Sequence, residues 1–111
     1  MKKRVSVCVG LLFLLSTSVL AEEQAVTALK QASAAVVHGK AGHVQALIEH
    51  AKAALEHTLA ASIVAKGVLK NHLDSGADEL QEAIDHGNLG HVGKATKHAE
   101  AAVVQIKAGS R

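Results

Sequence analysis

One heptapeptide occurs twice in this chain, and its duplication constrains the fold more than any other feature. The sequence HGKAGHV at 38–44 returns as HGNLGHV at 86–92, a shift of 48 residues. In each copy another histidine, His50 or His98, follows seven residues after the motif's second histidine. Paired glycines are typical of a helix end followed by a tight turn. We therefore expect two similar units, each organised around one glycine turn.

The sequence between these turns is predicted to be helical almost throughout. It is rich in alanine and contains no proline, so few residues interrupt a helix. The predicted helices cover Glu22 or Glu23 to Val37, about 43–65, about 71 to Asp85 or His86, and about 91–108. Gly39 with Gly42, and Gly87 with Gly90, are predicted to end the first and third helices.

The third helix is the least regular of the four. Asn71 is predicted to cap its N-terminus, because asparagine is favoured at that position. Ser75 and Gly76 weaken its first half, so a split there is possible.

Apolar residues on the second and fourth helices follow one helical face. On the second helix these are Val44, Leu47, Ile48, Ala51, Ala54, Leu55 and Thr58. On the fourth they are Val92, Ala95, Thr96, Ala99, Val103 and Ile106. Two such hairpins are each too small to bury a core alone and should pack on one another. The predicted fold is all-α, an antiparallel up-down-up-down four-helix bundle made of two repeated helical hairpins, with a core that is thin and only modestly stable.

Residues 1–21 have the character of a signal peptide. Lys2, Lys3 and Arg4 precede an apolar run, and 19–21 (VLA) offers small residues at a cleavage site. The run is short for a membrane span, although an uncleaved anchor is the alternative. Cleavage would leave residues 22–111 as one domain, which we expect in the periplasm as a monomer.

The predicted mature domain excludes several classes of protein. Cys8, Met1 and Phe13 are the only residues of their kinds, and all three leave with the signal peptide. Nine Lys and Arg then face ten Asp and Glu, a formal charge of −1. A disulfide is impossible, and without a basic patch or aromatic residues there is no sign of nucleic-acid binding. Nor do we expect a membrane partner after cleavage.

The histidines lie on four rows with a period of seven residues, one row per predicted helix. In chain order the rows are Gln24, Gln31 and His38; His43, His50 and His57; His72, Glu79 and His86; His91, His98 and Gln105. Seven residues make nearly two helical turns, so each row is a stripe on one side of its helix. On the last three helices the stripe flanks the apolar face, whereas on the first it lies nearly opposite that face.

Spacing along a row limits how an ion can be held. Residues seven apart are about 10.5 Å apart along the axis, too far for two imidazoles to share an ion through bonds of about 2 Å. Ligands must therefore come from two helices or from both sides of a glycine turn. In an antiparallel bundle the rows form three levels, with His38, His43, His86 and His91 at the turns. Next come Gln31, His50, Glu79 and His98, and at the far end Gln24, His57, His72 and Gln105.

A lone histidine on the flank of a helix is usually a solvated surface residue. That explanation fits the set poorly, because chance would not confine eight histidines to four such rows. We therefore predict that all eight histidines are metal ligands: His38, His43, His50, His57, His72, His86, His91 and His98. Whether Glu79 is also a ligand is left open, as is the sharing of one ion by both hairpins.

With these motifs the sequence resembles the bacterial small metal-binding protein (SmbP) family. The matching stretches are 35–44 (AVVHGKAGHV), 47–52 (LIEHAK) and 82–99 (EAIDHGNLGHVGKATKHA). The resemblance implies a small periplasmic helical bundle that binds several divalent transition-metal ions, copper especially, and buffers or carries them.

The chain departs from that family by having fewer histidines. Gln24, Gln31, Glu79 and Gln105 stand on the rows where the resemblance implies histidine, and there is no histidine-rich C-terminal tail. Fewer or weaker sites should follow, with the deficit at the end far from the glycine turns.

Imidazole with some carboxylate suits Cu(II), Ni(II) and Zn(II), and the general affinity order puts Cu(II) first. Without a thiolate or thioether, a dedicated Cu(I) site is disfavoured. An enzyme is not expected: the chain lacks the Glu-x-x-His pairs of di-iron bundles and the Cys-x-x-Cys-His of covalent haem. The alternative function is a periplasmic interaction or stress module in which the histidines act as a pH switch.

Overall fold

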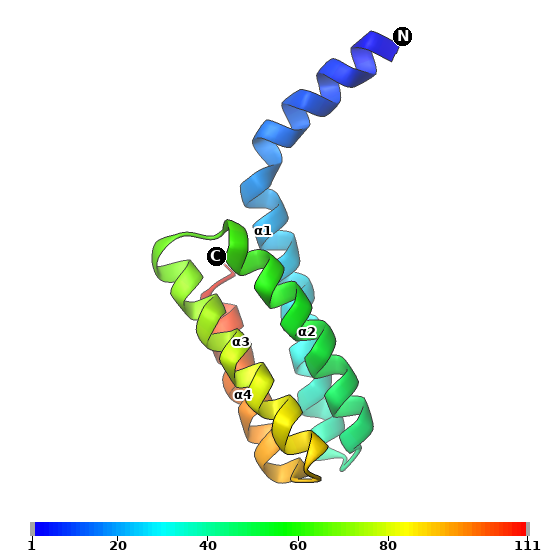
Figure 1. The fold of residues 1–111 in the computed structure, drawn as a ribbon, viewed down its shortest axis with the longest axis vertical. Coiled ribbons are helices and arrows are strands. Elements are labelled where there is room, and N and C mark those ends of the chain that lie inside the picture. The colour runs from blue at the N-terminus through cyan, green and yellow to red at the C-terminus, as the bar shows by residue number, and fades with distance from the viewer. Residues whose placement is uncertain (1, 111) are drawn as a thin grey trace.

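Four α-helices make up the described part of the chain in this computed structural model (Figure 1). The structure describes the backbone of residues 2–110 and the side chains of residues 19–110. The helices are α1 (Lys2–Lys40), α2 (Val44–Val64), α3 (Gly67–Asn88) and α4 (Val92–Ala108). No strand occurs among residues 2–110. The prediction of an all-helical bundle is therefore confirmed.

Successive helices run in opposite directions, and both glycine turns lie at one end of the bundle (Figure 1). Around the bundle α1 packs on α2, α2 on α3, α3 on α4, and α4 on α1. The groove between α1 and α2 and the groove between α3 and α4 consequently lie on opposite sides. We call α1 with α2 the first hairpin and α3 with α4 the second hairpin.

Helix α1 is longer than the sequence analysis predicts. It runs unbroken through position 21, and its N-terminal part extends beyond the other helices (Figure 1). The side chains of 1–18, which include most of the predicted signal peptide, lie outside the described residues, so cleavage after Ala21 stays a prediction. Among the helices of the described residues, none combines the length and the apolar character that crossing a membrane requires.

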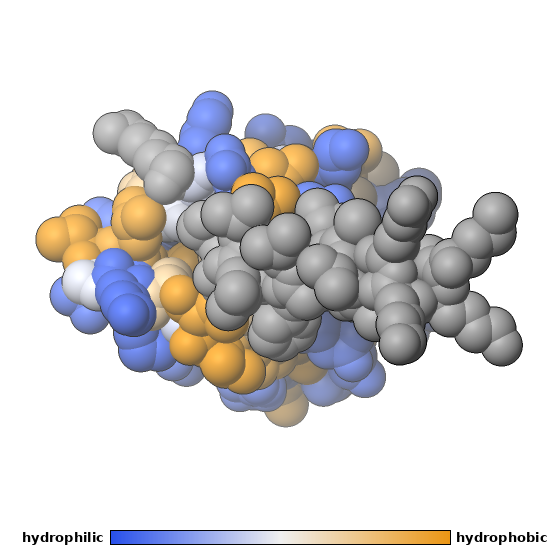
Figure 2. All heavy atoms as spheres, turned by 90° about the horizontal axis from the view of Figure 1, so that it is seen from above, coloured by the Kyte–Doolittle hydropathy of each residue, from blue (hydrophilic) through white to orange (hydrophobic). Residues whose placement is uncertain are grey.

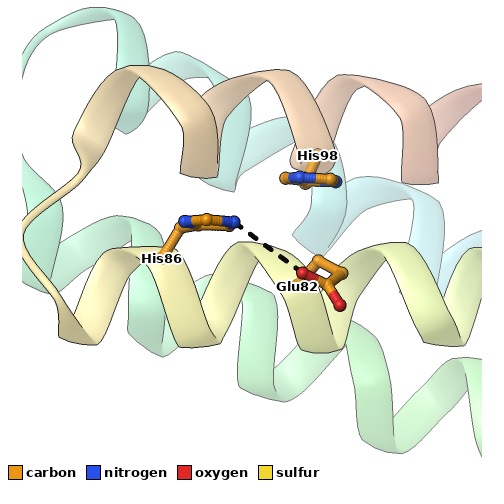
Figure 3. Close-up of side chains that lie close together, drawn as sticks. All are labelled: Glu82, His86 and His98. Carbon is orange, nitrogen blue, oxygen red and sulfur yellow. Dashed lines mark ion pairs between the residues drawn. The ribbon is translucent and has the colours of Figure 1, made fainter.

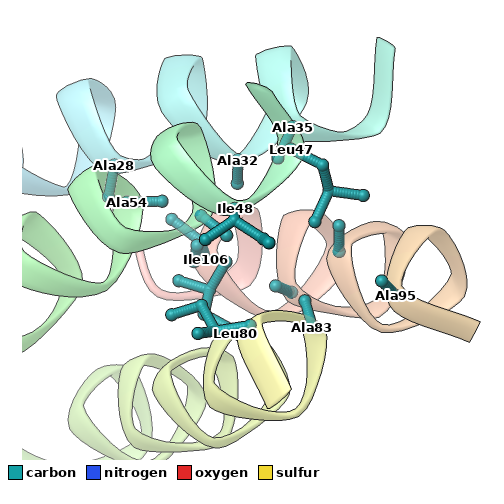
Figure 4. Packing of buried hydrophobic residues seen from close by; sticks show 14 of the residues in the cluster. Ala28, Ala32, Ala35, Leu47, Ile48, Ala54, Leu80, Ala83, Ala95 and Ile106 are labelled. Carbon is teal, nitrogen blue, oxygen red and sulfur yellow. The ribbon is translucent and has the colours of Figure 1, made fainter. Parts of the chain in front are cut away.

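The core consists mainly of alanine, with a few larger residues between the hairpins (Figure 4). Leu47, Leu73, Leu80 and Ile106 are its largest fully buried apolar side chains. Alanine lets helix backbones approach closely but buries little apolar area per residue, and burial contributes only about 25 cal/mol per Å². The stability that comes from the core alone is accordingly modest.

The buried face of α1 is lined by small residues, and some of its larger apolar side chains lie elsewhere. The buried side chains in its described part are Ala25, Ala28, Ala32 and Ala35. Val26 and Val37, by contrast, are exposed. Large apolar residues have the greatest weight when an apolar face is predicted from sequence. Close packing against α2, however, requires small residues. The prediction that the row of Gln24, Gln31 and His38 lies opposite the packed face is therefore wrong: all three are half-buried beside the alanine stripe.

Helix α3 also differs from its prediction at the start and in the middle. It begins at Gly67, and Lys66 is the N-cap, so Asn71 lies inside the helix, exposed, and caps nothing. The helix continues through Gly76 without a split. A Cβ at Gly76 would lie 2.9 Å from Cγ1 of Ile106, so this glycine allows α4 to approach. Tertiary packing outweighs the low helix propensity of the residue.

A polar network links the C-terminal end of α2 to the N-terminal part of α3. The buried hydroxyl of Ser62 donates to the carboxylate of Asp74, and Lys70 donates to Ser62 Oγ at 3.1 Å. Lys70 also donates to the Ser62 carbonyl oxygen at 3.1 Å, which satisfies an acceptor in the last turn of α2. Ile63 and Val68, which flank the α2–α3 connection, are exposed. Apolar atoms are visible at this end of the molecule (Figure 2).

Candidate metal centre

The two glycine turns are Schellman motifs, and this local structure pairs the histidines on either side. In the first turn the N–H of His43 donates to the His38 carbonyl oxygen at 2.8 Å, and that of Gly42 to the Gly39 carbonyl oxygen at 3.1 Å. Gly42 has a φ of 80°, the left-handed conformation that this motif places just after a helix. Gly42 therefore makes the turn, whereas Gly39 is buried inside α1.

The second turn repeats these bonds 48 residues later. His91 N–H donates to the His86 carbonyl oxygen at 2.8 Å, and Gly90 N–H to the Gly87 carbonyl oxygen at 2.9 Å. In a Schellman motif the residues at the ends of the longer bond usually make an apolar contact. Here imidazoles occupy those positions: ring centroids are 5.8 Å apart for His38 and His43, and 5.7 Å for His86 and His91.

A third imidazole joins each turn pair from the neighbouring helix. His50 of α2 stacks on His38 with ring centroids 5.1 Å apart and planes at 6°. His98 of α4 stacks on His86 at 5.2 Å and 3°. We define cluster 1 as His38, His43 and His50, and cluster 2 as His86, His91 and His98.

Below the clusters, each remaining row residue meets its counterpart across the hairpin. Gln31 accepts from His50 Nδ1 at 2.7 Å, and Gln24 accepts from His57 Nδ1 at 2.6 Å. In the second hairpin Glu79 Oε2 lies 3.0 Å from His98 Nδ1, and Gln105 accepts from His72 Nδ1 at 2.9 Å. All of these side chains are half-buried in the groove between the two helices.

A carboxylate that the sequence pattern does not indicate lies beside cluster 2. Glu82 Oε2 lies 3.8 Å from His86 Nε2, and one potential ligand atom each from Glu82, His86 and His98 falls within 4.8 Å of the others (Figure 3). Glu82 and His86 are four residues apart on α3, a spacing that places side chains on one face of a helix. That spacing was the available signal, because the row pattern considers residues seven apart only.

Cluster 1 has no counterpart of this carboxylate. The residue 48 positions before Glu82 is Ala34, and the residue 48 positions before Glu79 is Gln31, whose side chain is uncharged. The two clusters therefore share one imidazole geometry but differ in charge. Two carboxylates border cluster 2, whereas the row partners of cluster 1 are uncharged.

The predicted ligands fall into two groups. The structure brings six of the eight histidines together as clusters 1 and 2, each inside one hairpin. His57 and His72 are each placed against a glutamine, and their imidazole contacts within residues 19–110 do not extend to a second histidine. Glu79, left open from the sequence, lies at hydrogen-bond distance from His98.

The donor set of cluster 2 fits a divalent transition-metal ion. Imidazole nitrogen and carboxylate oxygen are ligands for Cu(II), Ni(II) and Zn(II). The side chains of His86 and His98 are 24% and 33% exposed, so an ion can reach them from solvent. Ligand atoms within 4.8 Å of one another can surround one ion at about 2 Å after small side-chain rotations.

Comparison with known proteins agrees with this geometry. A search of curated proteins finds no match to the chain. The small metal-binding protein family matches residues 1–109, nearly the whole sequence. The chain that folds into this helical bundle therefore belongs to the small metal-binding protein family.

Proposed function

We propose that this protein binds divalent transition-metal ions at clusters 1 and 2, takes Cu(II) ahead of Ni(II) and Zn(II), and buffers, stores or carries them in the periplasm. The observation that carries the proposal is the meeting of His86, His98 and Glu82 in one groove. Membership of a metal-binding family supports it.

The metal preference follows from the donor atoms. Sites of imidazole and carboxylate follow the general order in which Cu(II) binds more tightly than Ni(II) or Zn(II). The described side chains include no cysteine or methionine, and Cu(I) prefers those soft ligands.

The role as a buffer or carrier follows from the exposure of the clusters. Both are half-exposed in grooves on opposite sides of the bundle, and His43 and His91 are exposed. Ions in such sites exchange with solvent or with another protein more readily than ions enclosed in a core. We do not propose an enzymatic activity.

The proposal is tested by isothermal titration of the protein with Cu(II), Ni(II) and Zn(II). We expect about one ion per cluster, with Cu(II) bound most tightly. The matched control is the double variant His86→Gln and His98→Gln, which removes cluster 2 and leaves cluster 1 intact. Cu(II) binding that is unchanged in this variant would refute the assignment of cluster 2.

Export is tested separately by mass spectrometry of the protein recovered from the periplasm. We propose cleavage after Ala21, so the expected product begins at Glu22. Recovery of the intact chain in the cytoplasm would refute the proposed location without affecting the metal sites.

A further inference from the structure

Each row glutamine, and Glu79, lies at the Nδ1 atom of a histidine. The atom at 2.7 Å from His50 Nδ1 is Gln31 Oε1, and the atom at 3.0 Å from His98 Nδ1 is Glu79 Oε2. Neither oxygen carries a hydrogen, since a side-chain carbonyl and an ionised carboxylate are acceptors only. The histidine Nδ1 must therefore be the donor.

This hydrogen bond determines which ring nitrogen is free to bind a metal ion. A neutral imidazole has one N–H and one nitrogen with a lone pair. With the proton of His98 held on Nδ1, the lone pair is on Nε2, at the far side of the ring from Glu79. The same holds for His50 and Gln31 in the first hairpin.

The hydrogen bond between Glu79 and His98 orients the imidazole ring, because the two residues lie on different helices. Glu79 and His98 come from adjacent helices, and their side chains are 32% and 33% exposed. The bond thus spans the α3–α4 groove and fixes the ring of His98 beside His86. Histidines that bind metals commonly donate their other N–H to such an outer acceptor, which sets the ring's orientation and raises its basicity.

We infer that Glu79 and Gln31 are positioning residues, not metal ligands: each holds a histidine as the Nδ1–H tautomer and leaves Nε2 for the ion. This inference rests on the proposed function, because it assigns roles within the same clusters. It also gives a purpose to the row positions at which this chain lacks histidine.

The two positioning residues are not equivalent. A carboxylate is a stronger acceptor than an amide, and hydrogen bonds to charged acceptors are about twice as strong as neutral ones. Glu79 should therefore hold the ring of His98 more firmly than Gln31 holds the ring of His50. Cluster 2 then has the more firmly oriented nitrogen ligand as well as the additional carboxylate of Glu82.

The first experiment measures the tautomers without any metal. Long-range ¹H–¹⁵N correlation spectra of the histidine rings distinguish Nδ1–H from Nε2–H, and are recorded near pH 8, above the ordinary imidazole pKa of about 6.5. We expect His98 to be the Nδ1–H form. Glu79→Ala should shift His98 toward Nε2–H, the form that free histidine prefers in water, whereas Glu79→Gln should retain Nδ1–H.

The matched control is Asp78→Ala, which removes a carboxylate from the neighbouring, exposed residue of α3. It should leave the tautomer of His98 unchanged. Circular dichroism confirms that every variant remains helical. If His98 has the same tautomer in Glu79→Ala as in the unmodified protein, the inference is overturned, whatever the variant does to metal binding.

The second experiment titrates the same variants with Zn(II). Loss of an outer-shell partner typically weakens metal binding about 10- to 100-fold, so we expect a loss in this range at cluster 2 for Glu79→Ala. Glu79→Gln should recover part of it, and Asp78→Ala should behave as the unmodified protein. Equal affinity in Glu79→Ala and the unmodified protein overturns the positioning role.

These experiments separate the inference from the proposed function. An unmodified protein that shows the Nδ1–H form but takes up no Zn(II), Ni(II) or Cu(II) refutes the proposed function, and with it the ligand role of Nε2. A protein that binds these ions with His98 as the Nε2–H form supports the proposed function and overturns the inference alone.

Discussion

The rings of His86 and His98 are stacked and parallel, with centroids 5.2 Å apart and planes inclined by 3°. The lone pair of an imidazole nitrogen lies in the plane of its ring. Two parallel rings at this separation direct their lone pairs along parallel planes, so they do not both meet one ion at about 2 Å. Binding an ion between them requires that at least one ring rotate out of the stack.

This rotation gives a spectroscopic prediction. The ring of His98 lies close and parallel to that of His86, so the ring current of His86 shifts the ring-proton signals of His98 in the metal-free protein. Addition of Zn(II) should change these shifts as His86 rotates out of the stack, and the signals of His50 should change likewise as His38 rotates away from it. The measurement is a proton NMR titration. His57, which contacts Gln24 and no second imidazole, serves as the internal control, and an equal shift at His57 would contradict the assignment.

Glu82 should decide which cluster fills first. Glu82→Ala removes a ligand from cluster 2, and we expect its affinity for Zn(II) or Cu(II) to fall roughly tenfold, about 1.4 kcal/mol. The reverse change is available in cluster 1, because Ala34 occupies the position 48 residues earlier. Ala34→Glu should raise the affinity of cluster 1 by a similar factor. Both changes are measured by isothermal titration.

A control for charge alone is Glu56→Ala, which removes an exposed carboxylate of α2. It should alter the affinity of neither cluster by more than about twofold, since an exposed charge that contacts no ligand is largely screened by water and salt. If Ala34→Glu leaves cluster 1 unaffected, the two clusters do not share the geometry that their contacts indicate.

The affinity for metal ions should fall as the pH decreases. Only neutral imidazole binds a metal ion, so protons and metal compete for the same nitrogen. Histidine ordinarily has a pKa of about 6.5, so affinity should be near its maximum above that pH and fall as pH drops below it. Titrations of Cu(II) at about pH 7.5 and pH 5 measure the difference. Equal affinities would reject histidine as the main ligand.

Thermal melting at the same two pH values, with and without Cu(II), tests the alternative pH-switch function. If the histidines act only as a switch, the melting temperature should change with pH but not with Cu(II). For a metal-binding protein, ligand at 100 times its dissociation constant adds about 2.7 kcal/mol of stability. A domain of this size should then melt at least about 10 °C higher.

Much of this arrangement could be predicted from sequence. The period of seven places Gln31, His50, Glu79 and His98 at one level of the bundle, because an antiparallel hairpin with a known turn fixes which levels meet. That Gln31 pairs with His50, and Glu79 with His98, comes from the structure. The first residues of α2 and α4 are predicted to within one residue, because the glycine turns determine where these helices begin. These features depend on local backbone geometry, which sequence patterns reflect directly.

Other features depend on packing, which sequence patterns reflect poorly. The buried face of α1 is a stripe of alanines. Because Val26 and Val37 are larger but exposed, the sequence pattern does not identify this face. Glu82 was overlooked because it is off the period-seven row. Gly39 and Gly87 were interpreted as helix stops, whereas both lie inside helices, where the close approach of a neighbouring helix requires a residue without Cβ.

The last prediction concerns Gly87, which allows α2 to approach α3 next to cluster 2. A Cβ at this position would lie 2.7 Å from Cγ1 of Ile48 and 3.6 Å from Cδ2 of Leu47, both buried core residues. Gly87→Ala should therefore destabilise the protein by about 1–3 kcal/mol, the usual cost of overpacking. Thermal denaturation followed by circular dichroism measures the change. Because Gly87 follows His86 directly, the resulting displacement of α3 should also weaken metal binding at cluster 2.

Gly93 provides the matched control. It lies in α4, is exposed, and a Cβ there would meet nothing within 4 Å. Gly93→Ala should be neutral or stabilising, by up to about 1 kcal/mol, because alanine has the higher helix propensity. If both variants lower the melting temperature equally, the cost at Gly87 is not steric. If Gly87→Ala is as stable as the unmodified protein, the helices can separate at the turn end without penalty, and the spacing that brings His86 to His98 is not set by this contact.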